Sequence, residues 1–186
     1  MEVRETFRAK SGVEWRAWLE NHHASATEIW LLLERLPDPL GLSYLDAVEE
    51  AICFGWIDGI SKSLGDHERA QRFTPRRARS NWTELNKERA RRLEALGLMR
   101  EAGRAVLPDL DEEFHVSPAV ERAIRADPTA WANFTSFPEL YQRVRVGYIQ
   151  EMIGRPVEFD RRLRNFVRRT AQGQMFGNWN DGGRLG

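Results

Sequence analysis

The sequence places an acidic side chain inside a short apolar segment, at Asp58 in Cys53–Gly59 (CFGWIDG). Burying a carboxylate costs free energy unless a positive or hydrogen-bonding partner accompanies it. Arginine suits this role because its planar guanidinium matches a carboxylate with two parallel hydrogen bonds. Candidate partners follow along the chain at Arg72, Arg76, Arg77 and Arg79.

Two interpretations of Asp58 are open at the level of sequence. In the first, Asp58 pairs with Arg72 or Arg76 and only ties a strand to the following loop. In the second, Asp58 and an arginine face a pocket whose walls are Trp56 and Trp82, since ligand pockets are mostly apolar with a few placed polar groups. The first predicts that Asp58→Ala lowers stability, and the second predicts that it abolishes binding.

The segment Thr74–Ser80 (TPRRARS) has the composition of an anion-binding turn. Pro75 restricts the backbone, so the arginines after it project from a fixed turn. The segment leads into a predicted helix, whose free amide groups and dipole favour an anion at its N-terminus. The pattern predicts a phosphate or carboxylate site, and a solvated basic loop is the alternative.

No catalytic signature accompanies these residues. The sequence contains no Gly-x-Ser-x-Gly elbow, phosphate-loop motif or dinucleotide fingerprint, so it implies no cofactor. The single cysteine, Cys53, stands among apolar residues and is expected to be buried. The four histidines show no metal-ligand spacing, so we expect no metal site. A carboxylate beside an arginine is compatible with acid–base chemistry, so an enzymatic role stays open.

The charges are distributed unevenly along a chain whose net charge is zero. Residues 1–60 carry 5 basic and 11 acidic side chains (5 − 11 = −6), residues 61–105 carry 12 and 6 (12 − 6 = +6), and residues 106–186 carry 11 of each. The basic block 69–104, with Phe73 and Trp82 available for base stacking, raises the hypothesis of nucleic-acid binding. The neutral total and the glutamates within the block argue against that partner.

Local patterns predict a small sheet packed with helices over residues 1–106. Capping patterns at Ser11 and Ser43 predict two helices, and Gly55 is expected to end the second. Short apolar or alternating stretches predict strands at 28–33, 56–58 and 69–74. Residues 61–68 are expected to form a turn-rich loop.

A third helix is expected to begin at Ser80 or Thr83 and to end at Gly97, before a compact turn at 97–103. Its inward residues are predicted to be Leu85, Leu93 and Leu96. An acidic linker at 107–113 leads to a helical C-terminal region at 114–173 and a flexible tail at 174–186. The whole is therefore predicted to be an α+β protein.

The longest wholly apolar run is Ile29–Leu33, which is far too short for a membrane span. The N-terminal sequence MEVRETFRAK has no apolar signal region. We therefore expect a cytoplasmic protein.

Three motifs resemble the YdeI/OmpD-associated proteins, a bacterial group linked to bacteriocin protection. They are a Cys-Phe-Gly-Trp-Ile-Asp-Gly strand at 53–59, Arg-Phe-Thr-Pro-Arg at 72–76, and Ser-x-Trp-x-x-x-Asn at Ser80, Trp82 and Asn86. The resemblance covers residues 10–105, and the C-terminal region resembles the family's helical tail more weakly. The family's lysine-rich tail element is replaced here by Gly154–Glu158.

The resemblance implies a cytoplasmic bacterial protein involved in envelope stress or in resistance to antimicrobial peptides, with no established reaction. The matched residues are candidates for a shared ligand-binding site: Trp56, Asp58, Arg72, Arg76, Ser80, Trp82 and Asn86. The leading hypothesis is a stress-protection protein that binds a small anionic ligand or a protein partner there. An enzyme acting on an anionic metabolite with Asp58 as acid or base is the alternative, and nucleic-acid binding is the third.

Overall fold

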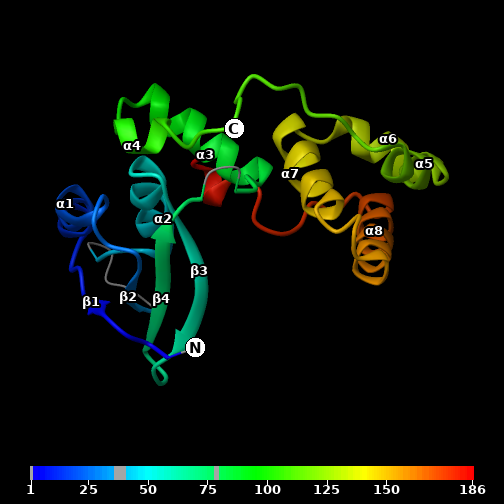
Figure 1. Cartoon of the computed structure of the whole chain (residues 1–186). Helices are drawn as coiled ribbons and strands as arrows, with labels where there is room; N and C mark the ends of the chain where they lie inside the picture. Colours follow the sequence, from blue (N-terminus) through cyan, green and yellow to red (C-terminus); the bar gives the residue numbers. More distant parts are fainter. Residues whose placement is uncertain (1, 36–40, 78–79) are drawn as a thin grey trace. The chain divides into compact units, whose positions relative to one another are not determined.

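The computed structural model describes residues 2–35, 41–77 and 80–186, and the chain divides into two compact units (Figure 1). The first unit contains residues 1–81 and 89–108, and the second contains 82–88 and 109–186. The first is a mixed sheet with helices and the second is helical, so the predicted α+β class is confirmed.

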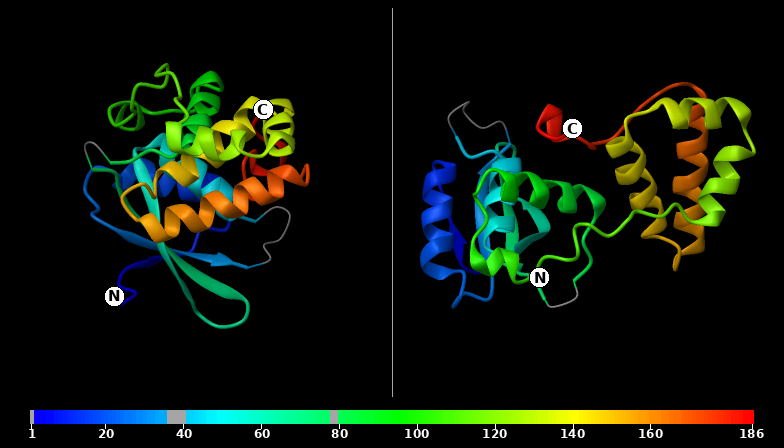
Figure 2. Two further views of the ribbon diagram at one scale, coloured as in Figure 1. Left: turned by 90° about the vertical axis from the view of Figure 1, so that its right-hand side faces the viewer. Right: turned by 90° about the horizontal axis from the view of Figure 1, so that it is seen from above.

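A mixed sheet of four strands, counted over the described residues, forms the centre of the first unit, with strand order β1-β2-β4-β3. Its strands are β1 (Thr6–Phe7), β2 (Ile29–Glu34), β3 (Trp56–Ser63) and β4 (Glu68–Pro75). β1 pairs with β2 in parallel, and the other pairs are antiparallel. β3 and β4 form a long hairpin (Figure 2). The predicted loop at 61–68 is therefore wrong at both ends, because residues 61–63 continue β3 opposite Ala70 and its neighbours and Glu68 begins β4.

Helices α1 (Gly12–His22) and α2 (Tyr44–Cys53) cover one face of this sheet. Both begin at the predicted caps, where the hydroxyl groups of Ser11 and Ser43 accept backbone hydrogen bonds three residues ahead. From α1, Trp15 packs on Phe73 of β4, with 5.3 Å between ring centroids. Trp15 and Phe73 are fully buried, so this face carries the core of the unit.

Two glycines allow the end of α2 to approach the short helix α4 (Glu101–Arg104). Gly55 follows α2 with a positive φ of 73°, which confirms its predicted role as a helix stop. A Cβ on Gly55 would lie 2.6 Å from the carbonyl oxygen of Ala102, and a Cβ on Gly103 would press against the backbone of Cys53. The compact turn predicted at 97–103 thus contains the start of a helix.

Helix α3 spans Glu84–Ala95. Its residues 84–88 belong to the second unit, and its remaining residues belong to the first. Gly97 ends it with a φ of 67°, as predicted. Leu93 is buried, but Leu96 is 54% exposed, so its predicted inward position is wrong. Leu96 lies beyond the last helical turn, where the helical period no longer decides which way a side chain points.

Ion pairs join the acidic N-terminal segment to the basic block within the first unit. Arg72 pairs with Glu28 at 2.5 Å, Arg92 with Glu49 at 2.9 Å, and Arg100 with Glu20 at 2.5 Å. The opposite charges counted along the sequence are therefore complementary parts of one folded unit.

The second unit is built from helices that lie side by side (Figure 2). They are α5 (Pro118–Arg125), α6 (Pro128–Ser136), α7 (Glu139–Gln150) and α8 (Pro156–Ala171). Asp127 caps α6 through two backbone hydrogen bonds of 3.0 Å. Tyr141, Val146 and Phe166 are fully buried at the centre of this bundle.

The C-terminal segment is ordered differently from the predicted flexible tail. It contains the 3₁₀ helix η1 (Asp181–Gly183), and Leu185 is buried against Leu140 and Val144 of α7. Burial of the apolar Leu185 side chain stabilises the packing of this segment against α7. Among the described residues, no helix has both the length and the apolar character needed to cross a membrane.

Glu158 in the first turn of α8 provides a pH-dependent contribution to stability. Its carboxylate accepts hydrogen bonds from Arg161 and Arg162, which lower its pKa from 4.5 to about 2. Because the pKa is lower in the folded state, the stabilisation is present above pH 4.5 and is lost as the pH falls toward 2. We expect Glu158→Gln to lower the melting temperature at pH 6 but to make little difference near pH 2. Glu139→Gln on α7, whose side chain is 87% exposed, is the control.

Candidate functional site

Asp58 lies on β3 and faces the helix-covered side of the sheet. It stands opposite Phe73 in the register, and directly opposed residues of antiparallel strands point to the same face. The hydroxyl group of Tyr44, the first residue of α2, donates a hydrogen bond of 2.5 Å to its carboxylate. The Asp58 carboxylate is therefore held by a neutral phenol rather than by one of the four predicted arginines alone.

Two arginines of β4 and its end lie near this Tyr44–Asp58 pair. The guanidinium of Arg69 lies over the ring of Tyr44, 4.8 Å from its centroid. Arg76 is only 6% exposed, and burial lowers its pKa to about 10, while the charge of Asp58 acts in the opposite direction. The negative charge of Asp58 therefore stabilises the charged form of Arg76, in line with the interpretation in which Asp58 and Arg76 interact.

Tyr44 is affected by the same group of charges. Its pKa is raised, first by burial and then by the hydrogen bond to Asp58, while Arg89 of α3 and Arg69 act to lower it. We call Tyr44, Asp58, Arg69, Arg76 and Arg89 the Tyr44–Asp58 cluster. All five belong to the first unit.

Arg72 is not part of this cluster, so of the two arginines considered as structural partners of Asp58, Arg72 is excluded. Arg72 donates two hydrogen bonds to Glu28, at 2.9 and 2.5 Å. The reason is the alternation of side chains along a strand: Phe73 shares the face of Asp58, so its neighbour Arg72 points to the opposite face.

Trp56 lies in the core rather than at a pocket wall. It is 1% exposed, its ring packs edge-on against Trp18 at 5.7 Å, and its indole nitrogen donates to the carbonyl of His23 at 3.2 Å. A buried indole with a satisfied N–H is typical of a structural tryptophan.

The remaining predicted residues are Ser80 in the first unit and Trp82 and Asn86 in the second. Ser80 is half-buried and its backbone N–H donates to the carbonyl of Arg77 at 3.0 Å. Trp82 and Asn86 belong to the second unit, where the Asn86 N–H donates to the Thr83 hydroxyl in the first turn of α3. Arg77 is exposed, and Arg79 lies outside the described residues.

Cys53 is buried, as predicted, and its surroundings make it a poor nucleophile. Burial and the nearby Glu50 raise its pKa to about 11, so the thiolate is scarce at neutral pH. Within the described ranges, no group of three or more histidine, cysteine or acidic side chains is placed to hold a metal ion.

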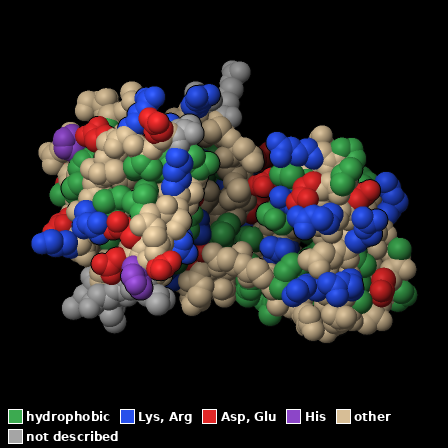
Figure 3. All heavy atoms as spheres, turned by 90° about the horizontal axis from the view of Figure 1, so that it is seen from below, with side chains coloured by type: hydrophobic (Ala, Val, Ile, Leu, Met, Phe, Trp, Pro, Cys, Tyr) green, Lys and Arg blue, Asp and Glu red, His purple; other side chains and the backbone are tan. Residues whose placement is uncertain are grey.

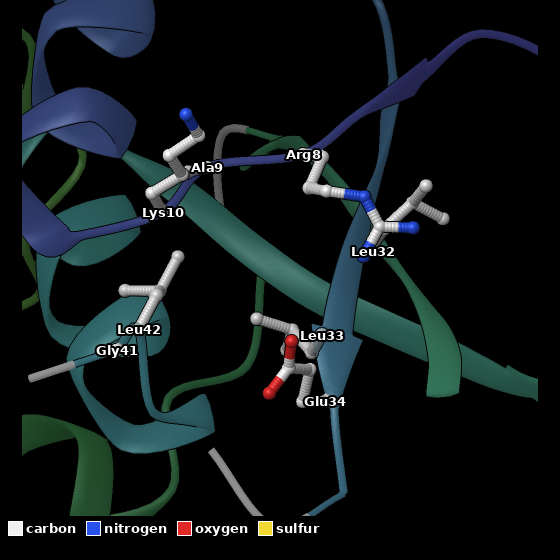
Figure 4. Close-up of a pocket in the computed structure, with 8 residues that line it drawn as sticks. All are labelled: Arg8, Ala9, Lys10, Leu32, Leu33, Glu34, Gly41 and Leu42. Atoms are coloured by element: carbon white, nitrogen blue, oxygen red, sulfur yellow. The ribbon is translucent and has the colours of Figure 1, made fainter. Parts of the chain in front are cut away.

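A small pocket of about 180 Å³ opens between the end of β2 and the chain before α1 and α2 (Figure 4). Leu33, Glu34 and Leu42 contribute side chains to it, and Arg8 lies at one side. Arg8 forms an ion pair with Glu68. Sequence patterns gave no sign of this pocket, because its lining comes from segments that are distant along the chain.

Sequence reasoning missed Tyr44 as the partner of Asp58, and Arg69 and Arg89 as charges near Tyr44. Arg69 had a usable signal, since it lies four residues before Phe73 and an even spacing along a strand preserves the face. No sequence signal identifies Tyr44 or Arg89, because the packing of α2 and α3 determines where their side chains lie.

The fold and this cluster define an α+β domain with a carboxylate–phenol pair among arginines, followed by a helical unit. Residues 7–106, 100 of the 186, match the family model described as a domain of unknown function (DUF8412), and the chain belongs to that family. Residues 113–173 match the model described as "Bacteriocin-protection, YdeI or OmpD-Associated". No curated protein and no solved structure matched the chain.

The predicted YdeI/OmpD-associated family is thus confirmed, but on a different part of the chain. The resemblance was placed on motifs within residues 10–105, whereas the match lies on helices α5 to α8. The absence of a lysine-rich element at Gly154–Glu158 therefore did not mark the C-terminal region as the weaker match.

Proposed function

We propose that this protein takes part in protection against bacteriocins and that its first unit binds a small anionic ligand at the Tyr44–Asp58 cluster. The family match on residues 113–173 supports the protective role. The arginines around Tyr44 support the ligand class, because guanidinium groups recognise carboxylates and phosphates.

The observation that carries the proposal is the environment of Arg69. Its side chain is half-buried over Tyr44, and its buried Nε has no hydrogen-bond acceptor among the described residues. A buried donor without an acceptor costs free energy, which an anionic ligand arriving beside Tyr44 would recover.

Binding fits the cluster better than acid–base catalysis. A tyrosine that acts as a base or nucleophile near neutral pH needs a lowered pKa, and the pKa of Tyr44 is raised. The carboxylate of Asp58 already accepts a hydrogen bond from the Tyr44 hydroxyl group in the folded state. Asp58 would have to give up this hydrogen bond to act as a base.

Nucleic-acid binding through residues 69–104 has less support. Arg72, Arg92, Arg100 and Arg104 pair with Glu28, Glu49, Glu20 and Glu94. Because these four arginines are paired with glutamates of the same unit, the block offers fewer charges for phosphate contacts than its composition suggests.

The test is a thermal-shift screen of the full chain against phosphates, nucleotides, acidic metabolites and lipid headgroups. A ligand at 100 times its Kd stabilises by about 2.7 kcal/mol, which shifts the melting temperature by several degrees. We expect Arg69→Gln to abolish this shift and Arg77→Gln, an exposed neighbour, to retain it.

The same variants test the protective role in bacteria that express them during bacteriocin challenge. Survival that follows wild type and Arg77→Gln but not Arg69→Gln supports both parts of the proposal. Equal survival of all three would show that protection does not depend on the Tyr44–Asp58 cluster. The absence of any ligand response in the screen would show that the proposed site does not bind these ligands.

A further inference from the structure

Arginines and aromatic rings alternate in a series of contacts within the second unit. The guanidinium carbon of Arg162 lies 3.6 Å from the ring centroid of Tyr148, and that of Arg145 lies 5.1 Å from the same ring. Arg145 also lies 4.3 Å from the ring of Phe176, and Arg169 lies 4.7 Å from that ring. Helices α7 and α8 and the segment after α8 therefore bring three positive charges together.

Only one of these three charges is balanced by an acidic side chain. Arg162 pairs with Glu158 at 2.6 Å and also donates to the carbonyl of Tyr148 at 2.7 Å. Across the described ranges, Arg145 and Arg169 form no ion pair and donate no side-chain hydrogen bond. The Nε atom of each is buried without an acceptor.

The surroundings of Arg145 make its charge costly. Burial lowers its pKa, and the charges of Arg162 and Arg169 lower it further, while only Tyr141 and Tyr148 act to raise it. Aromatic faces attract a cation, but they do not neutralise it as an anion does. A Cβ on Gly177 would lie 2.7 Å from Nη1 of Arg145, so the backbone there lies directly against the guanidinium.

We propose that Arg145 and Arg169 form a binding site for a phosphate group on the second unit, separate from the Tyr44–Asp58 cluster. A phosphate carries a charge of about −1.5 to −2 at neutral pH, which matches two arginines without an acidic partner. Its oxygens accept the paired N–H groups of a guanidinium. Phe176 fixes both side chains, so little side-chain freedom is lost on binding.

The surface around such a site favours a phosphate that is accessible from outside. Arg145 and Arg169 are both half-buried rather than enclosed, and Tyr148 is 41% exposed. Figure 3 shows one face of the second unit, on which Lys and Arg side chains gather beside hydrophobic ones. A free phosphate and a lipid phosphate share this chemistry, and the experiment separates them.

The test follows the arginine Nε–H signals of the full chain in ¹H–¹⁵N spectra, in phosphate-free buffer. Inorganic phosphate and pyrophosphate form one arm, and phosphatidylcholine vesicles with and without phosphatidic acid form the other. We expect the signals that disappear in Arg145→Gln and in Arg169→Gln to shift on titration in the wild type. Either substitution should weaken binding about 10- to 100-fold, as expected for losing a charged hydrogen bond.

Arg164→Gln is the matched control, because Arg164 is an exposed residue of the same helix α8. Response to soluble phosphate identifies a soluble ligand, and response only to phosphatidic acid identifies a lipid headgroup. If neither probe shifts the Arg145 and Arg169 signals of the folded wild type, the site does not exist. If Arg164→Gln weakens binding as much as the other two, attraction is general to the surface and the proposal is wrong.

Discussion

Gly103→Ala is expected to lower the free energy of unfolding by about 1–3 kcal/mol, since an added methyl group has no space there. The new Cβ would lie against the carbonyl group of Cys53, 2.8 Å from its carbon and 2.9 Å from the oxygen of Ile52. These are backbone atoms at the end of α2, so no side-chain rotation can relieve the clash. The carbonyl of Cys53 also accepts the Arg100 N–H at 3.0 Å, and that bond would be displaced with it.

Urea unfolding followed by circular dichroism measures this change. Gly12→Ala is the control, because Gly12 begins α1 and a Cβ there has no atom within 4 Å. That substitution should be neutral or stabilising by up to about 1 kcal/mol. A Gly103→Ala protein as stable as Gly12→Ala would mean that α4 does not dock against α2 as described.

Much of this fold could be predicted from local patterns in the sequence. The caps at Ser11 and Ser43 and the glycine stops at Gly55 and Gly97 depend on chemistry within a few residues, and all four were placed correctly. The docking of α2 on α4 could not be predicted, because it depends on Gly55 lying against the backbone of Ala102 and on Gly103 lying against the backbone of Cys53, which are distant along the chain. The docked C-terminal segment was missed for the same reason, since Leu185 finds its apolar partners on α7.

The candidate site could be predicted only in part. Asp58 can be picked out because a carboxylate in an apolar segment needs a partner. The sequence around Asp58 does not identify which residue that partner is. The opposite faces of Phe73 and Arg72 exclude Arg72, and this follows from strand register, which the turn and the bulge between Asp58 and Ser61 determine. Arg145 and Arg169 could not be predicted as a pair, because nothing in their spacing shows that they lack acidic partners.

The charge pattern shows how one sequence feature can support two different conclusions. A block of net +6 suggests a polyanionic partner when it is viewed alone, yet an acidic segment of net −6 precedes it. In the structure, pairs such as Arg92–Glu49 and Arg100–Glu20 connect the two segments. The pairs that remain exposed add little stability individually, so their main effect is to cancel the field of the block.

Trp56→Ala is expected to lower the free energy of unfolding by about 3–5 kcal/mol, which distinguishes a core residue from the wall of a ligand pocket. The substitution removes a fully buried indole, its edge-on contact with Trp18 and its hydrogen bond to the His23 carbonyl. A cavity would remain between β3 and α1, because close-packed surroundings relax only partly. Urea unfolding of the variant, followed by circular dichroism, measures the loss.

Trp56→Phe separates the contributions, because it keeps most of the apolar surface and removes only the N–H donor and part of the ring. We expect it to cost about 1–3 kcal/mol, mainly from the unsatisfied carbonyl of His23 and the smaller packing volume. Ligand binding at the Tyr44–Asp58 cluster should survive in Trp56→Phe, since Trp56 forms none of that cluster's contacts. A Trp56→Phe protein with unchanged stability but no ligand response would instead restore Trp56 as a binding residue.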